Sequence, residues 1–310
     1  MFENLRMLDS IRLNIGPEGL LVINLSIAVI FFGVSLDFTF RNFREGLKNT
    51  KSLVTGLVSQ FILLPLITFI LVKIINPPAP VALGMILVAA CPGGIVSKFI
   101  INLAKGNVPL SVTMTNIGSV AALLLTPLNY LIWSHLYISG ADTGRPLAVS
   151  FLPMFTTVLL LAGIPMAVGF VLSNWFPAFT SKIYRPIRIF SFMAFVCIII
   201  TAFASNFDHF LIYVPPIFFL VLLHNGSGLL FGWLTAVIMK RPVPDQRAIS
   251  IDTGIQNSSL ALVLIFNSRI FDPLLDLGGM AFIAGWWAIW HILAGLILAG
   301  YWSRKPVQQP

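Results

Sequence analysis

The sequence predicts an all-α integral membrane protein with nine transmembrane helices, two of them broken by polar segments. Three observations carry this prediction. First, 57% of the 310 residues are hydrophobic, only 10% are charged and the mean hydropathy is +0.93, so ionisable side chains are too few to cover a soluble protein of this size. Second, the apolar residues fall into runs of about 20, the length that crosses a bilayer. Third, two of these runs are interrupted by glycine, proline or a charge.

The apolar runs follow one another with short connections. Residues 1–16 are expected to form an interfacial lead-in and not a signal peptide, because Glu3 and Asp9 interrupt the basic residues and no small-residue cleavage site follows. The longest connections, 37–51 and 134–146, are loops, so no soluble domain is expected. The predicted spans lie near residues 19–36, 52–76, 80–104, 108–133, 147–173, 187–205, 210–239, 246–268 and 277–302.

The charge distribution predicts how the chain is oriented. The net charge is +8, but the basic residues stand in short clusters between apolar runs, which is typical of loops that anchor a membrane protein and not of a nucleic-acid partner. Counting alternate loops gives five Lys and Arg on one side and thirteen on the other. The sequence therefore predicts a multi-pass cytoplasmic-membrane protein with its N-terminus outside and its C-terminus in the cytoplasm. The thirteen are Arg41, Arg44, Lys48, Lys51, Lys105, Lys182, Arg185, Arg188, Lys240, Arg241, Arg247, Arg304 and Lys305.

The two polar interruptions predict a binding centre. They are Cys91-Pro-Gly-Gly-Ile-Val-Ser-Lys98 in the third run and Asp252-Thr-Gly-Ile-Gln-Asn-Ser-Ser259 in the eighth. Charges and unpaired backbone groups at membrane depth are tolerated only where they line an enclosed or watery site. The two runs cross in opposite directions, and paired broken helices of this kind indicate an inverted-repeat carrier with its site near the midplane. The halves contain four and five spans, so one repeat has lost its first helix.

Charged and polar residues near these interruptions are the candidate ligands. If the helix unwinds at Gly254, the carbonyls of Thr253 and Ile255 become oxygen ligands of the kind that hard cations prefer. A charge near the bilayer centre costs roughly 2.5 to 3.5 kcal/mol, so Lys98 and Asp252 are expected to pair. Further polar candidates on neighbouring runs are Gln60, Ser97, Ser111, Thr115, Gln256, Asn257 and Ser258.

Other polar residues have more ordinary explanations. Serine, threonine and glycine stripes in membrane helices are commonly packing seams, and the segment from His224 to Gly228 favours a close helix contact. Ser97 beside Lys98 could suggest a hydrolase, but adjacent helical residues point about 100° apart and cannot easily share a proton, so no enzyme is expected. Cys91 and Cys197 indicate neither a disulfide framework nor a metal cluster.

The polar segments resemble the bile acid:sodium symporter family. The stretch from Cys91 to Ser97, continued by Gly106-Asn107-Val108-Pro109-Leu110-Ser111-Val112-Thr113-Met114-Thr115, is similar to the conserved core of that family. The segment Asp252-Thr-Gly-Ile-Gln-Asn-Ser258 resembles the family's Glu-x-Gly-Met-Gln-Asn-Ser sequence. The resemblance runs through nearly the whole chain and is that of a bacterial homologue of the apical sodium-dependent bile acid transporter. Vertebrate members likewise lack the first of ten helices.

The resemblance implies a two-domain transporter. A panel domain, about 17–40 and 147–206, would move against a core domain, about 50–134 and 208–303. Sodium is implied as the coupling ion and no other cofactor is. The first sodium site would use Ser97, Lys98, Ser111, Thr115 and Asp252; the second would use Gln60, Asp252, Thr253, Ile255 and Gln256; and the substrate would lie near Gly94, Ile95, Asn257 and Ser258.

Two departures from the family pattern shape the expected function. The chain has Lys98 where the family has Asn and Asp252 where the family has Glu, so the lysine ammonium is expected to take the place of the first sodium. We therefore expect a secondary transporter of organic anions, bile-acid-like or small carboxylates, with reduced or altered sodium coupling. Proton coupling, uncoupled facilitation and a non-transporting anion receptor are the alternatives. The expected partners are the anion and the lipid bilayer, with no prediction of an oligomeric state.

Overall fold

The computed structural model describes residues 17–40, 43–44, 47–94, 96–139, 149–204, 207–267, 269–271 and 277–305. Within this part the chain is helical, and its single β-type pairing is an isolated bridge. The predicted lead-in, residues 1–16, lies outside it. The elements are α2 (Pro17–Ser35), η2 (Leu47–Asn49), α4 (Thr50–Val58), η3 (Ser59–Leu63), α5 (Leu64–Ile75), α6 (Ala79–Ala90), α7 (Ser97–Leu103), α8 (Val108–Ser139), α9 (Phe151–Val158), η4 (Leu159–Gly163), α10 (Ile164–Trp175), α11 (Pro177–Ala204), α12 (Phe207–Ile238), α13 (Val243–Gly254), α14 (Ser258–Phe266) and α15 (Gly278–Ser303).

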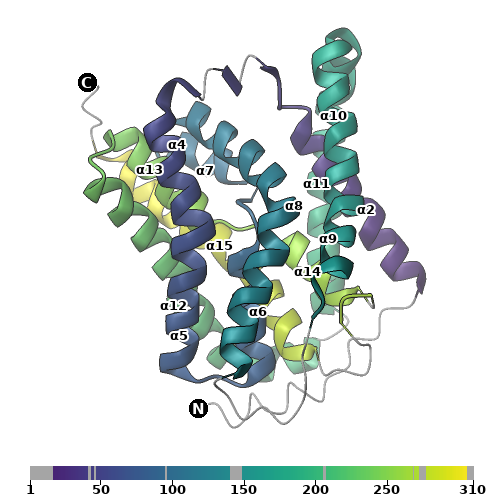
Figure 1. The fold of residues 1–310 in the computed structure, drawn as a ribbon, viewed down its shortest axis with the longest axis vertical. Helices are drawn as coiled ribbons and strands as arrows, with labels where there is room; N and C mark the ends of the chain where they lie inside the picture. The colour runs from purple at the N-terminus through teal and green to yellow at the C-terminus, as the bar shows by residue number, and fades with distance from the viewer. Residues whose placement is uncertain are drawn as a thin grey trace.

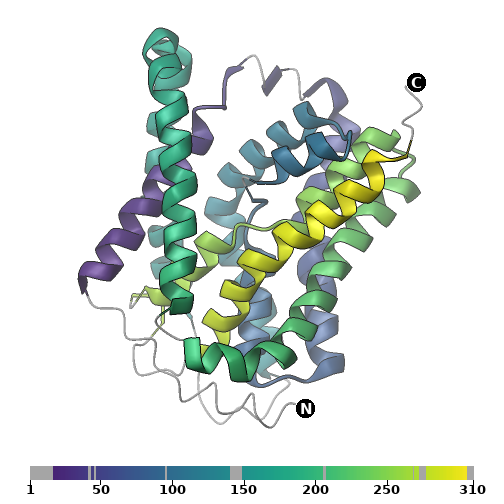
Figure 2. The same cartoon turned by 180° about the vertical axis from the view of Figure 1, so that it is seen from behind.

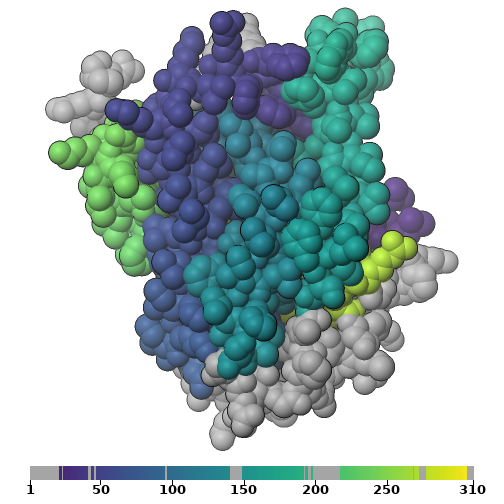
Figure 3. Space-filling view, in the orientation of Figure 1, coloured from purple at the N-terminus to yellow at the C-terminus, as the bar shows by residue number. Residues whose placement is uncertain are grey.

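The helices form two groups that stand side by side (Figure 1). One group, here the side bundle, consists of α2, α9, α10 and α11; the other, here the main bundle, consists of α4 to α8 and α12 to α15. The view from behind shows the same division in its upper half, where α2 and α11 lie apart from α12 and α15, whereas α12 begins directly below the end of α11 (Figure 2). On the front face, α8 packs against α4 and α5 on one side and against α9 on the other (Figure 3).

The fold is that of an integral membrane protein. Among the described residues, five helical stretches are long and apolar enough to cross a bilayer. Large apolar side chains such as Ile62, Leu152 and Ile297 are more than half exposed, and lipid would cover a surface of this kind. The stretches are Leu47–Ile75, Val108–Ser139, Phe151–Trp175, Ile217–Ile238 and Gly278–Ser303, with the shorter apolar helices Asn24–Ser35 and Ala79–Ala90 beside them.

Every predicted apolar run coincides with a helix or a pair of helices, so the all-α expectation is confirmed for the described residues. The largest difference is α11, which begins at Pro177 instead of 187. Its first turns carry Lys182 and Arg185, and a helix can continue beyond the apolar run because helical hydrogen bonding does not depend on side-chain polarity. The number of membrane crossings remains a prediction.

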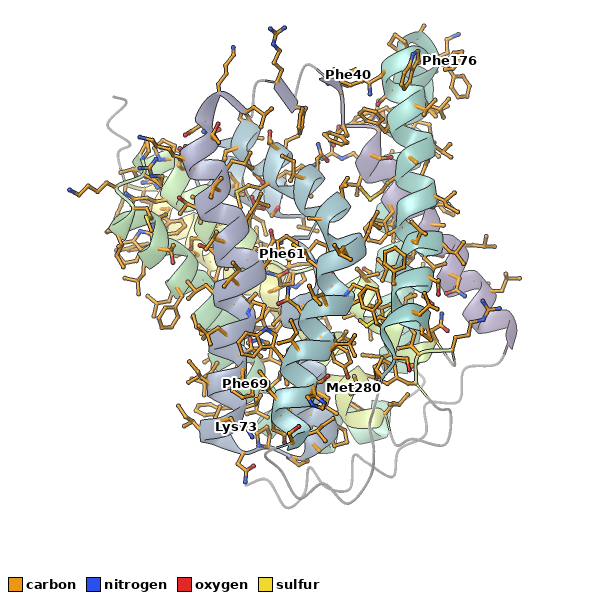
Figure 4. All side chains as sticks on the ribbon, viewed as in Figure 1. Phe40, Phe61, Phe69, Lys73, Phe176 and Met280 are labelled. Carbon is orange, nitrogen blue, oxygen red and sulfur yellow. The ribbon has the colours of Figure 1, made fainter. Side chains whose placement is uncertain are left out.

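Two π-helical turns interrupt long helices, one at η3 and one at η4. Each ends two residues before a proline, Pro65 in α5 and Pro165 in α10. Proline has no amide hydrogen, so the carbonyl four residues earlier loses its α-helical donor and the chain rearranges locally. The first of these turns contains Gln60 and Phe61, and Phe61 lies at about half the height of the molecule (Figure 4).

Small residues set the closest contacts between helices. An added Cβ at Gly84 in α6 would lie 2.8 Å from the backbone Cα of Met280 in α15, and one at Gly232 in α12 would lie 2.8 Å from the Cβ of Thr253 in α13. In the side bundle, a Cβ at Gly169 would press against Ser35 of α2. In a bilayer the hydrophobic effect does not drive helices together, so membrane helices associate through close packing at small residues. The contacts at these glycines are of that kind.

A buried carboxylate ties three helices together at one end of the main bundle. Asp245, in the first turn of α13, accepts hydrogen bonds from the Ser52 hydroxyl at 2.6 Å, from the Asn107 side chain at 2.7 Å and from Asn49. The backbone N–H of Asn107 also donates to the carbonyl of Pro244 at 3.0 Å. This network fixes where α13 begins relative to α4 and α8, and with it the position of the break that follows at Gly254.

Gly84→Ala should destabilise the main bundle. The new methyl group would meet the backbone of Met280, which cannot move as a side chain can, and overpacking of this kind costs about 1 to 3 kcal/mol. Thermal unfolding of the detergent-solubilised protein measures the change. Gly300→Ala is the matched control, because nothing lies within 4 Å of the added Cβ and it should be neutral or slightly stabilising. Equal melting temperatures for the two variants would contradict the seam.

Candidate functional site

The two broken helices meet at their breaks. Gly93, between α6 and α7, forms an antiparallel bridge with Gln256, between α13 and α14. The Gly94 amide donates to the Ile255 carbonyl at 2.7 Å, and the Asn257 amide donates to the Pro92 carbonyl at 2.7 Å. Backbone groups that the breaks release from helical bonding are thus paired with each other, as the membrane interior requires.

The residues at the breaks allow this close approach. Pro92 cannot donate a helical hydrogen bond, so α6 ends before it. A Cβ on Gly94 would lie 3.1 Å from the Gln256 carbonyl, and one on Gly93 would lie 3.0 Å from the side-chain nitrogen of Gln60. Glycine at these two positions therefore lets one broken segment lie against the other and against η3.

Asp252 lies one turn before the second break and is enclosed by protein. It is 1% exposed, and its Oδ1 accepts a hydrogen bond from the Ser111 hydroxyl of α8 at 3.1 Å. Its Oδ2 has no hydrogen-bond partner. A buried carboxylate oxygen without a donor is costly, so this atom indicates a place for a cation or a proton.

Further buried polar atoms around Asp252 also lack partners. They are the side-chain oxygens of Gln256 at the second break and of Thr115 and Asn116 in α8, and the side-chain nitrogen of Gln60 in η3. The hydroxyl of Thr253 in α13 also lacks a partner, but it faces Gly232 of α12. Hydroxyl, amide and carboxylate oxygens are the ligands of hard cations. A set of hydroxyl and amide oxygens with one carboxylate is a hard donor set, which suits an alkali or alkaline-earth cation better than a transition metal.

Lys98 does not contact Asp252, and the expected direct pair was wrong. Its ammonium nitrogen instead lies 2.9 Å from Oδ2 of Asp37, which follows α2 in the side bundle. The reason is solvation: Asp37 is 26% exposed and keeps some access to water, whereas Asp252 is enclosed and its Oδ1 is taken by Ser111.

A cavity of about 260 Å³ lies between the side bundle and the main bundle, directly beside the breaks. The side bundle contributes Asp37 and Arg188, and the main bundle contributes Lys98, Ser258 and His291. The hydroxyl of Ser258 is buried without a hydrogen-bond partner, whereas the Asn257 side chain accepts from the amide of Leu260. The cavity thus combines an apolar wall with a few polar groups, which is typical of a small-molecule site.

The structure brings nearly all the predicted site residues together. Gln60, Ser111, Thr115 and Asp252 and the unwound segment that follows it surround one buried region. The hydroxyl of Ser97 donates to the Gly94 carbonyl at 2.9 Å, so it helps to hold the first break. Gly94, Asn257 and Ser258 line the cavity as expected, and Ile95 lies outside the described residues.

Sequence reasoning missed some residues of the site. Asp37 and Arg188 were assigned to loops or to anchoring, although both line the cavity. Asn225 was assigned to helix packing, but its side chain donates to the Gly254 carbonyl at 2.6 Å and holds the end of α13. The packing interpretation was right for Gly228, which contacts Gly254, and wrong for Gly226, where an added Cβ would meet nothing within 4 Å.

Comparison with known proteins agrees with this geometry. Residues 24–212, which include the first break, match the Sodium Bile acid symporter family. The chain belongs to this family. The sodium-dependent transporter YocS of Bacillus subtilis, described as uncharacterized, is 32% identical over 91% of this chain and 83% of its own. The probable sodium/metabolite cotransporter BASS1 of Arabidopsis thaliana is 31% identical over 91% of this chain and 67% of its own. The P3 protein of Mus musculus is 32% identical over 72% of this chain and 46% of its own.

Family membership confirms the predicted resemblance and sets the class of function. This member of a symporter family is an integral membrane transporter and not an enzyme, as the sequence predicted. The substrate, the coupling ion and the role of each site residue are matters for proposal.

Asn225→Ala should destabilise this member of the family through the second break. The carbonyl of Gly254 would lose its buried donor, and an unpaired buried group costs about 1 to 3 kcal/mol. Differential scanning fluorimetry of the purified protein measures the loss. Asn102→Ala, at an exposed position of α7, is the control. Its free energy of unfolding should stay within about 0.5 kcal/mol of that of the parent, so its melting temperature should hardly change. A wild-type melting temperature for Asn225→Ala would show that this bond does not hold the break.

Proposed function

We propose that this protein is a secondary carrier that couples the movement of a small organic anion to sodium through the cation site at the crossed breaks. The observation that carries the proposal is the group of buried, unpartnered oxygens around Asp252, separated only by the first break from a cavity that contains two basic residues. An ion and an anion held this close influence each other's binding, which is the requirement for symport.

The topology fits nine crossings with the C-terminus in the cytoplasm. The connections from α2 to α4, α7 to α8, α10 to α11 and α12 to α13 lie at the same end of the molecule as the C-terminus (Figures 1 and 2). The thirteen basic residues that decided the orientation lie in these connections and in the helices next to them, except Arg304 and Lys305, which follow α15 at the same end of the molecule. Lys73 lies at the opposite end (Figure 4). The antiparallel pairing of the breaks supports the inverted repeat.

The side bundle corresponds to the panel domain and the main bundle to the core domain. The proposed panel, 17–40 and 147–206, contains the side bundle, and the proposed core, 50–134 and 208–303, contains α4 to α8 and α12 to α15; residues 147–148 and 205–206 lie outside the described part. The cavity lies between the two, so a movement of one against the other would open it to alternate sides of the membrane.

The second sodium site is the proposed coupling site. It would use Gln60, Asp252, Thr253, Ile255 and Gln256. Two observations support this choice: the Gln256 oxygen and Asp252 Oδ2 are buried without partners, and the Gln256 side-chain nitrogen donates to the Thr253 carbonyl at 2.8 Å, so these two residues of the set lie together. The Ile255 carbonyl already accepts a hydrogen bond from the Gly94 amide. The affinity of this site for sodium would therefore depend on whether the two breaks are hydrogen-bonded to each other.

Lys98 is the proposed substitute for the first sodium ion. Ser97, Ser111, Thr115 and Asp252 would otherwise form that site, and a fixed ammonium group nearby opposes a second cation electrostatically.

Gln60→Ala and Asp252→Asn should each reduce sodium-driven uptake by about tenfold or more, because each removes a ligand or a charge from the cation site. Uptake into proteoliposomes under imposed sodium and proton gradients, with a panel of carboxylates and bile salts, measures the effect and identifies the coupling ion. Gln246→Ala also removes a glutamine side chain, but near the start of α13 and away from the proposed site, so it serves as the control. Undiminished sodium stimulation in both site variants would exclude this site.

Lys98→Asn should add a sodium requirement. Without the fixed ammonium, the first site regains an amide oxygen, and the Hill coefficient for sodium should rise from about one toward about two. The sodium dependence of initial uptake rates provides the measurement. Lys51→Asn, which removes an exposed lysine from the first turn of α4, should leave the coefficient unchanged. An unchanged coefficient in Lys98→Asn would separate Lys98 from the ion sites.

A further inference from the structure

We infer that Asp37 occupies the position of the substrate carboxylate on Lys98, and that a small carboxylate ligand replaces it there. The inference rests on the proposed function and assigns to Lys98 a direct contact with the transported anion. Binding of the anion would then break the ion pair that links the two bundles. Binding of the substrate and separation of the side bundle from the main bundle at this point would therefore occur together.

The position of the pair supports this exchange. Asp37 belongs to the side bundle, two residues beyond α2, while Lys98 belongs to the first turn of α7 in the main bundle. Their 2.9 Å contact is the ion pair that joins the bundles within the described part of the chain, and both residues line the cavity. Any movement that separates the bundles at this point must therefore remove Asp37 from Lys98.

The charges of the cavity favour an anionic ligand. Among the described residues of its lining, Lys98 and Arg188 contribute two positive charges and Asp37 contributes one negative charge, so one carboxylate more would neutralise these groups. Asp252 lies behind the break, where it is enclosed and hydrogen-bonded to Ser111. A monocarboxylate is the simplest ligand that satisfies this balance.

Asp37 has a second partner to which it can turn. The Tyr184 hydroxyl of α11 is hydrogen-bonded to Asp37 and accepts a hydrogen bond from Arg188 at 3.1 Å. Once a ligand holds Lys98, Asp37 can remain beside Tyr184 and Arg188 within the side bundle. Its carboxylate is therefore not left unpaired when the ligand displaces it, which keeps the cost of the exchange small.

The size of the cavity limits the ligand. At about 260 Å³ it lies below the roughly 300 to 1,000 Å³ typical of sites for drug-sized molecules. The ligand groups available besides Lys98 include the unpartnered hydroxyl of Ser258. A short carboxylic acid that carries a hydrogen-bonding group fits this combination better than a steroid acid does.

Chemical rescue of Asp37→Ala tests the exchange directly. Acetate reproduces the side-chain carboxylate that this variant lacks, so added acetate should bind at Lys98 and raise the melting temperature of the variant more than that of the wild type. Acetamide, which has nearly the same shape without the charge, should have no effect. The double variant Asp37→Ala with Lys98→Met should not respond to acetate. An equal acetate response in the double variant, or none in Asp37→Ala, would overturn the inference.

Transport supplies a second measurement that does not depend on the alanine variant folding. Asp37→Asn retains the shape of the side chain and removes the internal competitor, so KM for a carboxylate that the wild type transports should fall about fivefold to tenfold. Asp37→Glu, which keeps the carboxylate, should remain near the wild-type KM. An unchanged or higher KM in Asp37→Asn would contradict the exchange. If the wild type transports none of the carboxylates under either gradient, the proposed function fails, while the acetate experiment still decides the inference.

Discussion

The structure depends on the pairing of backbone groups between the two broken helices. A helix that stops inside a membrane leaves amides and carbonyls without partners, and each would be costly in hydrocarbon. Here the bonds from Gly94 to Ile255 and from Asn257 to Pro92 satisfy them across the crossing. The crossing can therefore hold an unwound segment, side-chain oxygens and a carboxylate at membrane depth. The glycines, the buried Asn225 and the helix seams around Gly84 and Gly232 all serve to keep these two segments in register.

Much of this arrangement could be predicted from the sequence, because the signals are local. Runs of about 20 apolar residues fix the helices, and Pro92 or Gly254 inside such a run fixes a break. The ligand candidates followed from polar residues placed next to those breaks. Their meeting in one region could also be expected, since membrane-buried polar groups must find each other or water.

The parts that escaped prediction are those decided by distance in space. Lys98 and Asp37 are 61 residues apart, and Asp37 stands at the end of an apolar run, where an acidic residue normally begins a loop. Arg188 was counted as an anchor because a basic residue near a membrane surface usually is one. Which carboxylate a lysine chooses depends on the relative desolvation of the two, and the sequence does not show that Asp252 is the more enclosed.

The π-helical turn at Ser59–Leu63 has a consequence for how relatives of this protein are aligned. Such a turn contains one residue more than an α-helical turn, so a deletion of a single residue there would restore a regular α-helix and leave the parts before and after it in nearly the same relative orientation. In a relative with that deletion, the side chain that faces Gly93 would stand four residues before the proline, whereas Gln60 stands five before Pro65. The spacing between this glutamine and Pro65 is therefore as informative as the glutamine itself, and a gap misplaced between them would align the wrong side chain with the proposed cation site.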